Sequence, residues 1–170
     1  MLITIRPGSG ALVRLAAVAA VAASAWVQPA TARSVEKAVG HAGPFTIHSI
    51  SEAGRFDRCA ADLVGASGTV RLSWDRNHDY SISVPAPKTG GTGTELRLAT
   101  DRGVVSHEAI VEGGRARAKL DNAGVEALID TRVRIVVDFG GDHHVWPIGT
   151  TRMGDVFVEM ENCVWRAQGR

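Results

Sequence analysis

The sequence is poor in the residues that build redox centres and strongly charged interfaces. Its 170 residues include two cysteines, Cys59 and Cys163, which lie far apart rather than in a C-x-x-C motif. Aromatic residues make up 5% of the chain, and 19 basic residues nearly balance 18 acidic ones. Because a near-neutral chain has no basic excess to attract polyanions, we expect neither nucleic acid nor an anionic membrane surface as a partner.

Long hydrophobic runs are also lacking. The longest, at residues 15–27, is about 13 residues long, which is shorter than the roughly 20 residues that cross a bilayer. It follows Arg6 and Arg14 and precedes the small residues Ala30, Thr31 and Ala32. This order is typical of a cleavable secretory signal. We therefore expect residues 1–32 to be a signal peptide cleaved after Ala32. The mature chain would be periplasmic or secreted, without an integral membrane segment.

Recognisable catalytic motifs are missing as well. The Gly-rich segment at residues 90–93 is not followed by the Lys and Ser or Thr of a phosphate-binding loop. Ser106, His107 and Glu108 are residue types found in hydrolases, but residues 33–170 contain no G-x-S-x-G elbow to present a nucleophile. We therefore expect neither enzymatic activity nor a cofactor.

One segment resembles part of a calcium-binding loop. Asp75, Asn77 and Asp79 match the first, third and fifth ligand positions, but Tyr80 replaces the glycine of the sharp turn, and Ala86 replaces the bidentate glutamate. A hairpin turn explains the segment better than a calcium site.

The two cysteines predict a disulfide. In an oxidising compartment, an even pair of cysteines outside a C-x-x-C motif most simply forms one structural bond. A bond between Cys59 and Cys163 would attach the last helix of the chain to an early strand.

Alternation of apolar and polar residues predicts strands from Phe45 onward. The clearest unit is a hairpin, in which residues 70–75 and 80–84 each place three apolar side chains on one face. Residues 33–43 show no clear period, and we expect them to be a flexible lead-in to a single β-rich domain at residues 44–170. Further strands are predicted at residues 45–50, 55–64, 95–98, 104–111, 115–120, 132–139 and 144–148, the last as an edge strand because of Pro147.

Two helices are predicted. Asp121 can cap a short helix in which Val125, Leu128 and Ile129 share one face. Thr151 can cap a C-terminal helix with apolar residues at helical spacing from Met153 to Val164. The expected fold class is α+β: mainly an antiparallel β-sheet, or a small β-barrel or sandwich, with one short helix and a C-terminal helix.

Two polar clusters are candidate sites. Arg115, Arg117 and Lys119 form a basic stripe, which we interpret as the solvated face of an edge strand, with an anion site as the alternative. Asp142, His143 and His144 carry metal-ligand chemistry. The two histidines could share one ion only if the turn breaks the strand alternation, so exposed turn histidines are the simpler interpretation.

The order of the last elements resembles that of a known family. Residues 115–164 run strand, helix, strand, strand and helix in a chain with an export signal. In this the chain is similar, over roughly residues 69–165, to the invasion-associated locus B type of small exported alphaproteobacterial proteins. Those proteins usually carry an early Trp shortly followed by Cys and further cysteines within the domain. This chain has Phe45 near the start and only Cys59 and Cys163. The resemblance implies an envelope-associated, non-enzymatic role in host or surface interaction.

Three functions follow as hypotheses. The preferred one is a periplasmic or secreted binding or accessory protein, which contacts a protein or cell-envelope partner through a β-sheet surface. The first alternative is a periplasmic metal-binding protein that uses Asp142, His143 and His144. The second is a small inhibitor of an exported protease, in which the loop at residues 85–93 would enter the protease cleft.

Overall fold

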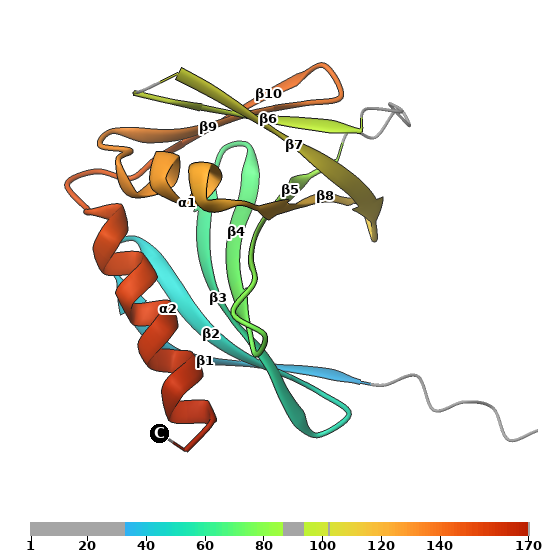
Figure 1. The fold of residues 1–170 in the computed structure, drawn as a ribbon, viewed down its shortest axis with the longest axis vertical. Helices are drawn as coiled ribbons and strands as arrows, with labels where there is room; N and C mark the ends of the chain where they lie inside the picture. Colours follow the sequence, from blue (N-terminus) through green and yellow to red (C-terminus); the bar gives the residue numbers. More distant parts are fainter. Residues whose placement is uncertain (1–32, 87–93, 102, 170) are drawn as a thin grey trace, which may run out of the picture. The chain divides into compact units, whose positions relative to one another are not determined.

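The structure, a computed structural model of the chain, describes residues 33–86, 94–101 and 103–169. The predicted signal peptide at residues 1–32 and the Gly-rich segment at residues 90–93 lie outside the described residues, as does most of the predicted inhibitory loop. The described residues belong to one compact unit. Figure 1 shows their path from the first strand to the C-terminal helix.

Ten strands and two helices make up the described part of the chain (Figure 1). Neither helix has the length and hydropathy needed to cross a membrane, among the residues described. The strands are β1 (Ser34–Ala42), β2 (Phe45–Glu52), β3 (Arg55–Gly65), β4 (Gly68–Asp75), β5 (Tyr80–Pro85), β6 (Glu95–Thr100), β7 (Gly103–Glu112), β8 (Arg115–Leu120), β9 (Arg134–Phe139) and β10 (Asp142–Pro147). The helices are α1 (Asn122–Ile129) and α2 (Met153–Ala167).

These strands form one antiparallel sheet in the order β1-β2-β3-β4-β5-β8-β7-β6-β9-β10. The first five strands follow one another as sequential neighbours, as do β9 and β10. Between them, β5 pairs with β8, and β7 and β6 lead on to β9. Because β1 and β10 stand at opposite ends of this order, the sheet of the described residues is open. The β-rich α+β class is therefore confirmed, and the sheet is not a closed barrel.

The first strand corrects our prediction for residues 33–43. We expected a flexible lead-in, but Ser34–Ala42 pairs with β2 from Ser34 opposite Glu52 to Ala42 opposite Phe45. Residues on both faces of β1 are exposed. A strand exposed on both faces needs no alternation of apolar and polar residues, so its sequence carries no periodic signal.

The sheet has two unlike faces, because neighbouring residues along a strand point to opposite sides. One side, which we call the covered face, belongs to a single hydrophobic core and packs against the helices. Its residues on β2–β5 include Ile47, Cys59, Ala61, Leu72, Trp74 and Ile82. The opposite side, which we call the polar face, carries the residues that alternate with them.

The C-terminal helix α2 covers β1 to β4 (Figure 1). Its buried residues include Met153, Val156, Phe157, Met160 and Val164, as the helical spacing predicted. Cys163 forms a disulfide with Cys59 of β3, with 6.1 Å between the Cα atoms. The predicted bond between the last helix and an early strand is confirmed.

An aromatic group extends the covered face at the end of the β4–β5 hairpin. The ring of Tyr80 stacks on Trp74, with 5.3 Å between centroids, and meets the edge of Phe157 from α2, also at 5.3 Å. The Tyr80 hydroxyl donates a hydrogen bond of 2.9 Å to Glu161. Burial, together with the bond to this carboxylate, raises the pKa of Tyr80 above its ordinary value.

One of the two predicted helix caps is confirmed. The Asp121 carboxylate accepts a hydrogen bond of 2.8 Å from the Gly124 amide at the start of α1. At α2 the N-cap residue is Arg152, and no side chain caps the helix, so the prediction of Thr151 is wrong. The side chain of Thr151 instead packs over the turn at Gly43, where even a Cβ atom would clash with it.

The far end of the sheet is anchored to the turn between β3 and β4. The Trp146 indole of β10 donates a hydrogen bond of 2.8 Å to the Gly68 carbonyl, and the Val145 amide donates one of 3.2 Å to the Ser67 hydroxyl. Gly65 lies directly against the indole, because an added Cβ would come within 2.8 Å of Trp146 Cδ1. This contact joins β10, at one end of the sheet order, to the turn between β3 and β4.

Candidate binding face

The polar face is the part of the molecule that gathers charged side chains from many strands. The ladder places Asp62 of β3 opposite Arg71 of β4, Arg71 opposite Ser83 of β5, and Ser83 opposite Arg117 of β8. Opposite residues in a ladder share a face, so these side chains form a row across four neighbouring strands. Glu36 of β1 and His48 of β2 continue the row toward the edge of the sheet.

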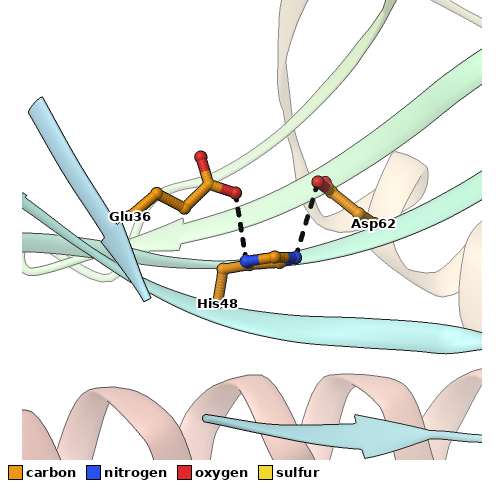
Figure 2. Close-up of side chains that lie close together, drawn as sticks. All are labelled: Glu36, His48 and Asp62. Atoms are coloured by element: carbon orange, nitrogen blue, oxygen red, sulfur yellow. Dashed lines mark ion pairs between the residues drawn. The ribbon is translucent and has the colours of Figure 1, made fainter. Parts of the chain in front are cut away.

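At the β1 end of this face, a histidine lies between two carboxylates. Figure 2 shows the His48 imidazole flanked by Glu36 and Asp62. His48 Nδ1 is 3.1 Å from a Glu36 oxygen, and His48 Nε2 is 3.8 Å from an Asp62 oxygen. A neutral imidazole has a single N–H and can donate to only one of them, whereas the protonated ring can donate to both.

Arg71 ties the same two carboxylates together. Its Nε and Nη2 atoms donate to the two oxygens of Asp62 at 2.7 and 2.6 Å, and Nη2 also donates to Glu36 at 2.6 Å. The hydrogen bond to Asp62 raises the pKa of Arg71 above its ordinary value. Bidentate contact of this kind fixes both partners in direction as well as in distance.

Glu36, His48 and Asp62 also have the chemistry of a metal site. One ligand atom from each lies within 4.8 Å of the others. However, Arg71 already donates hydrogen bonds to both carboxylates and offsets part of their negative charge. A cation would have to displace this guanidinium, so the arrangement fits an internal ion-pair network better than a metal centre.

A hollow of about 540 Å³ lies over β4, β5, β7 and β8. Its walls carry cationic and anionic side chains, which include Asp75, Asp79, Glu108, Arg117 and Lys119. Lys119 and Asp79 form an exposed ion pair of 2.8 Å. The guanidinium of Arg117 and the carboxylate of Glu108 make no hydrogen bond or ion pair with any described residue.

The basic stripe lies on an inner strand, which corrects our prediction of an edge strand. β8 pairs with β5 on one side and with β7 on the other. The sequence could not reveal this position, because β5 and β8 are separated by two strands and become neighbours only in the folded sheet. Arg117 and Lys119 are exposed, whereas Arg115 is half-buried.

The predicted metal residues of β10 lie apart from this face. His143 is exposed, with its Nδ1 atom 2.6 Å from Asp138, whereas His144 is buried and stacks on Trp146. The two histidines are consecutive in a regular ladder with β9, so their rings point to opposite sides. Together with Asp142 they form no ligand group among the residues that the structure describes.

The calcium-loop-like segment and the hydrolase-type residues do not form sites either, among the residues described. In the Asp75 segment, the carboxylate of Asp75 accepts hydrogen bonds from the Asn77 and Asp79 amides and stabilises a hairpin turn, as we expected. In β7, His107 is buried and packs against Gly124 of α1, whereas Ser106 and Glu108 are exposed. The three hydrolase-type residues therefore do not converge.

The chain matches no protein-family model, and comparison with curated proteins and with solved structures finds no similar one. The similarity to the invasion-associated locus B proteins stays a prediction. The functional argument therefore rests on the geometry of the polar face.

Proposed function

We propose that this chain is an exported, non-enzymatic binding protein of the cell envelope that recognises a protein or envelope partner through its polar face. The observation that supports this most directly is the hollow of about 540 Å³, whose walls carry charged groups of both signs. Arg117 and Glu108 are exposed there without partners among the described residues, so both are available to a ligand.

Export is supported by two independent features. The order of basic, apolar and small residues before Arg33 is typical of a secretory signal. The Cys59–Cys163 disulfide belongs to a class of bonds that persist in oxidising compartments. N-terminal sequencing of the protein from its native host should begin at Arg33, and recovery of intact Met1 in the membrane fraction would contradict export with cleavage.

A retention experiment tests the binding face. The full chain is expressed in its native host, purified, immobilised and exposed to solubilised envelope components. The test variant carries Arg117→Glu and Lys119→Glu in the hollow. The matched control carries Arg97→Glu and Arg134→Glu, which change exposed arginines of β6 and β9 outside the hollow.

The wild-type protein and the control should retain the same component, and the hollow variant should lose it, because charge reversal replaces attraction with repulsion. Equal retention by all three proteins would show that the polar face is not the binding surface. Retention of nothing by the wild-type protein would remove the proposed binding function.

The two alternative functions, metal binding and protease inhibition, are each tested by a separate experiment. For the metal hypothesis, stoichiometric zinc or copper binding that disappears in a His143→Ala, His144→Ala variant would favour a metal-binding protein. For the inhibitor hypothesis, slowing of an exported protease that depends on residues 85–93 would favour a protease inhibitor. The opposed directions of His143 and His144 support the binding protein over the metal protein.

A further inference from the structure

We propose that the polar face contains a subsite for an oxyanion, the carboxylate or phosphate group of a ligand, formed by the guanidinium groups of Arg115 and Arg117 beside Ser83. The inference rests on the proposed function, because it names the chemical group that this face would recognise. It also reverses our interpretation of the basic stripe, which assumed an edge strand.

Arg115 is held in place entirely by neutral oxygens. Its Nε atom donates to the Ser83 hydroxyl at 2.7 Å, and its Nη2 atom donates to the carbonyls of Thr69 and Ser83, both at 2.8 Å. No carboxylate of a described residue forms an ion pair with it, although the guanidinium is half-buried. Even partial burial of a cation without an anion is unfavourable, and an anionic ligand would relieve this cost.

The surroundings of Arg115 also disfavour its charged form, which makes the binding of an anion more favourable. Burial and the nearby positive charge of Arg71 lower the pKa of Arg115, and Asp62 compensates only in part. Asp62 is already engaged in two hydrogen bonds with Arg71. The nearest carboxylate of the row is therefore committed to another guanidinium.

Arg115 and Arg117 lie two residues apart on the polar face of β8. Ser83 lies opposite Arg117 in the β5–β8 ladder, and the Arg115 side chain reaches Ser83 from two residues along β8. The Nη1 atom of Arg115 makes no hydrogen bond with a described residue, and the whole Arg117 guanidinium is free in the same sense. Both side chains therefore retain N–H groups for a ligand, and planar guanidinium donors suit the oxygens of a carboxylate or phosphate.

Two glutamates near the subsite could compete with a ligand. Glu112 lies opposite Arg115 in the β7–β8 ladder, and Glu108 lines the hollow with Arg117. Both are exposed, and neither forms an ion pair with these arginines. They oppose an incoming anion by weak repulsion but do not occupy the guanidinium groups.

Titration with small anions tests the subsite. Inorganic phosphate and succinate are added separately to the purified protein, and sodium chloride at matched ionic strength serves as the reference. The Arg115 Nε–H signal is followed in proton–nitrogen correlation NMR spectra. The variants are Arg117→Gln for the subsite, Glu112→Gln for the competing carboxylate, and Arg134→Gln as the matched control on β9.

We expect a saturable shift of the Arg115 signal with at least one of the two anions and none with chloride. Arg117→Gln should weaken the binding by about tenfold, because one charge-assisted hydrogen-bonding group is lost. Glu112→Gln should strengthen it, and Arg134→Gln should leave it unchanged. A response to phosphate alone or to succinate alone identifies the preferred group.

Absence of a saturable shift, an equal shift with chloride, or unchanged binding in Arg117→Gln would overturn the subsite. The result is separable from the retention experiment. If retention depends on the hollow but no anion binds, the binding face stands and the oxyanion subsite fails. If an anion binds but no envelope component is retained, the subsite stands and the proposed function fails.

Discussion

Different interactions stabilise the two faces of the sheet. On the covered face, the stabilising contacts are apolar burial under α2 and one disulfide. On the polar face, they are hydrogen bonds and ion pairs such as those of Arg71 with Glu36 and Asp62. Apolar burial is the dominant favourable contribution to folding, whereas partly exposed ion pairs contribute little. The covered face therefore maintains the fold, and the polar face is free to carry a binding function.

The largest expected effect is on the attachment of α2 to the covered face. In the chain-entropy model, a disulfide that closes a loop of about 100 residues contributes on the order of 4.7 kcal/mol. Cys163→Ser should therefore lower the melting temperature far more than a surface substitution does, because the unfolded chain regains the freedom that the closed loop removes. Thermal unfolding followed by circular dichroism measures this effect.

The bond itself can be examined by mass spectrometry. Without reductant, the wild-type protein should be two hydrogen masses lighter than the dithiol, and neither cysteine should react with an alkylating reagent. Free alkylation of Cys59 and Cys163 in the native protein would contradict the attachment of α2 by a disulfide.

A matched pair of substitutions on β4 compares the two faces directly. Leu72 and Arg71 are consecutive residues that point to opposite faces. Leu72→Ala should cost about 2–5 kcal/mol of unfolding free energy, since it leaves a cavity in the core. Arg71→Gln should cost about 1–2 kcal/mol through its lost hydrogen bonds. Urea denaturation measures both, and a larger loss for Arg71→Gln would reverse the assignment of stability to the covered face.

A smaller effect is expected at the shorter helix, which packs against the same core through Leu128. Asp121→Ala removes the cap of α1 and should cost about 1 kcal/mol of unfolding free energy. Asp121→Asn keeps an acceptor oxygen and should retain most of the stability that Asp121→Ala loses. If Asp121→Ala causes no loss of stability, the carboxylate does not act as a helix cap.

The smallest effect is a pH dependence at the margin of the covered face. Tyr80 is the only tyrosine of the chain, so tyrosinate absorbance reports on it alone. Because its pKa is raised in the folded protein, absorbance should appear above the ordinary value of about 10. The linked stability is fully present below that pH and is lost as the pH rises through the folded value.

Glu161→Gln provides the comparison for this titration. It removes the negative charge that opposes ionisation of Tyr80, so the absorbance step should move to lower pH. A wild-type protein that titrates at the ordinary tyrosine value while still folded would contradict the burial and the Glu161 hydrogen bond.

Features encoded by local pattern could be predicted from the sequence. The β4–β5 hairpin, the α1 cap at Asp121 and the apolar face of α2 each depend on residues close together in the chain. The Cys59–Cys163 bond could also be predicted, because no other cysteine was available as a partner. The predicted edge position of β10 is consistent with its place at the end of the sheet order.

Features that depend on strand register and on the topology of the whole sheet could not be predicted. Glu36, His48, Asp62 and Arg71 come from four strands, and no spacing rule connects them. A weak signal was present, since His48 and Asp62 interrupt segments of otherwise small or apolar residues. The inner position of β8 was missed for the same reason, because its two partners are decided by the topology of the whole sheet.

The contact between Trp146 and the β3–β4 turn sets the order in which the domain can be completed. This hydrogen bond joins residues that are 78 positions apart, and the disulfide joins residues separated by 104. Contacts of such high sequence separation form slowly, because a long loop must close before they contribute. Because the chain is synthesised from its N-terminus, the residues of β2 to β4 are complete before those of β10 and α2. Until the last segment arrives, the apolar side of these strands is open to water and to other chains.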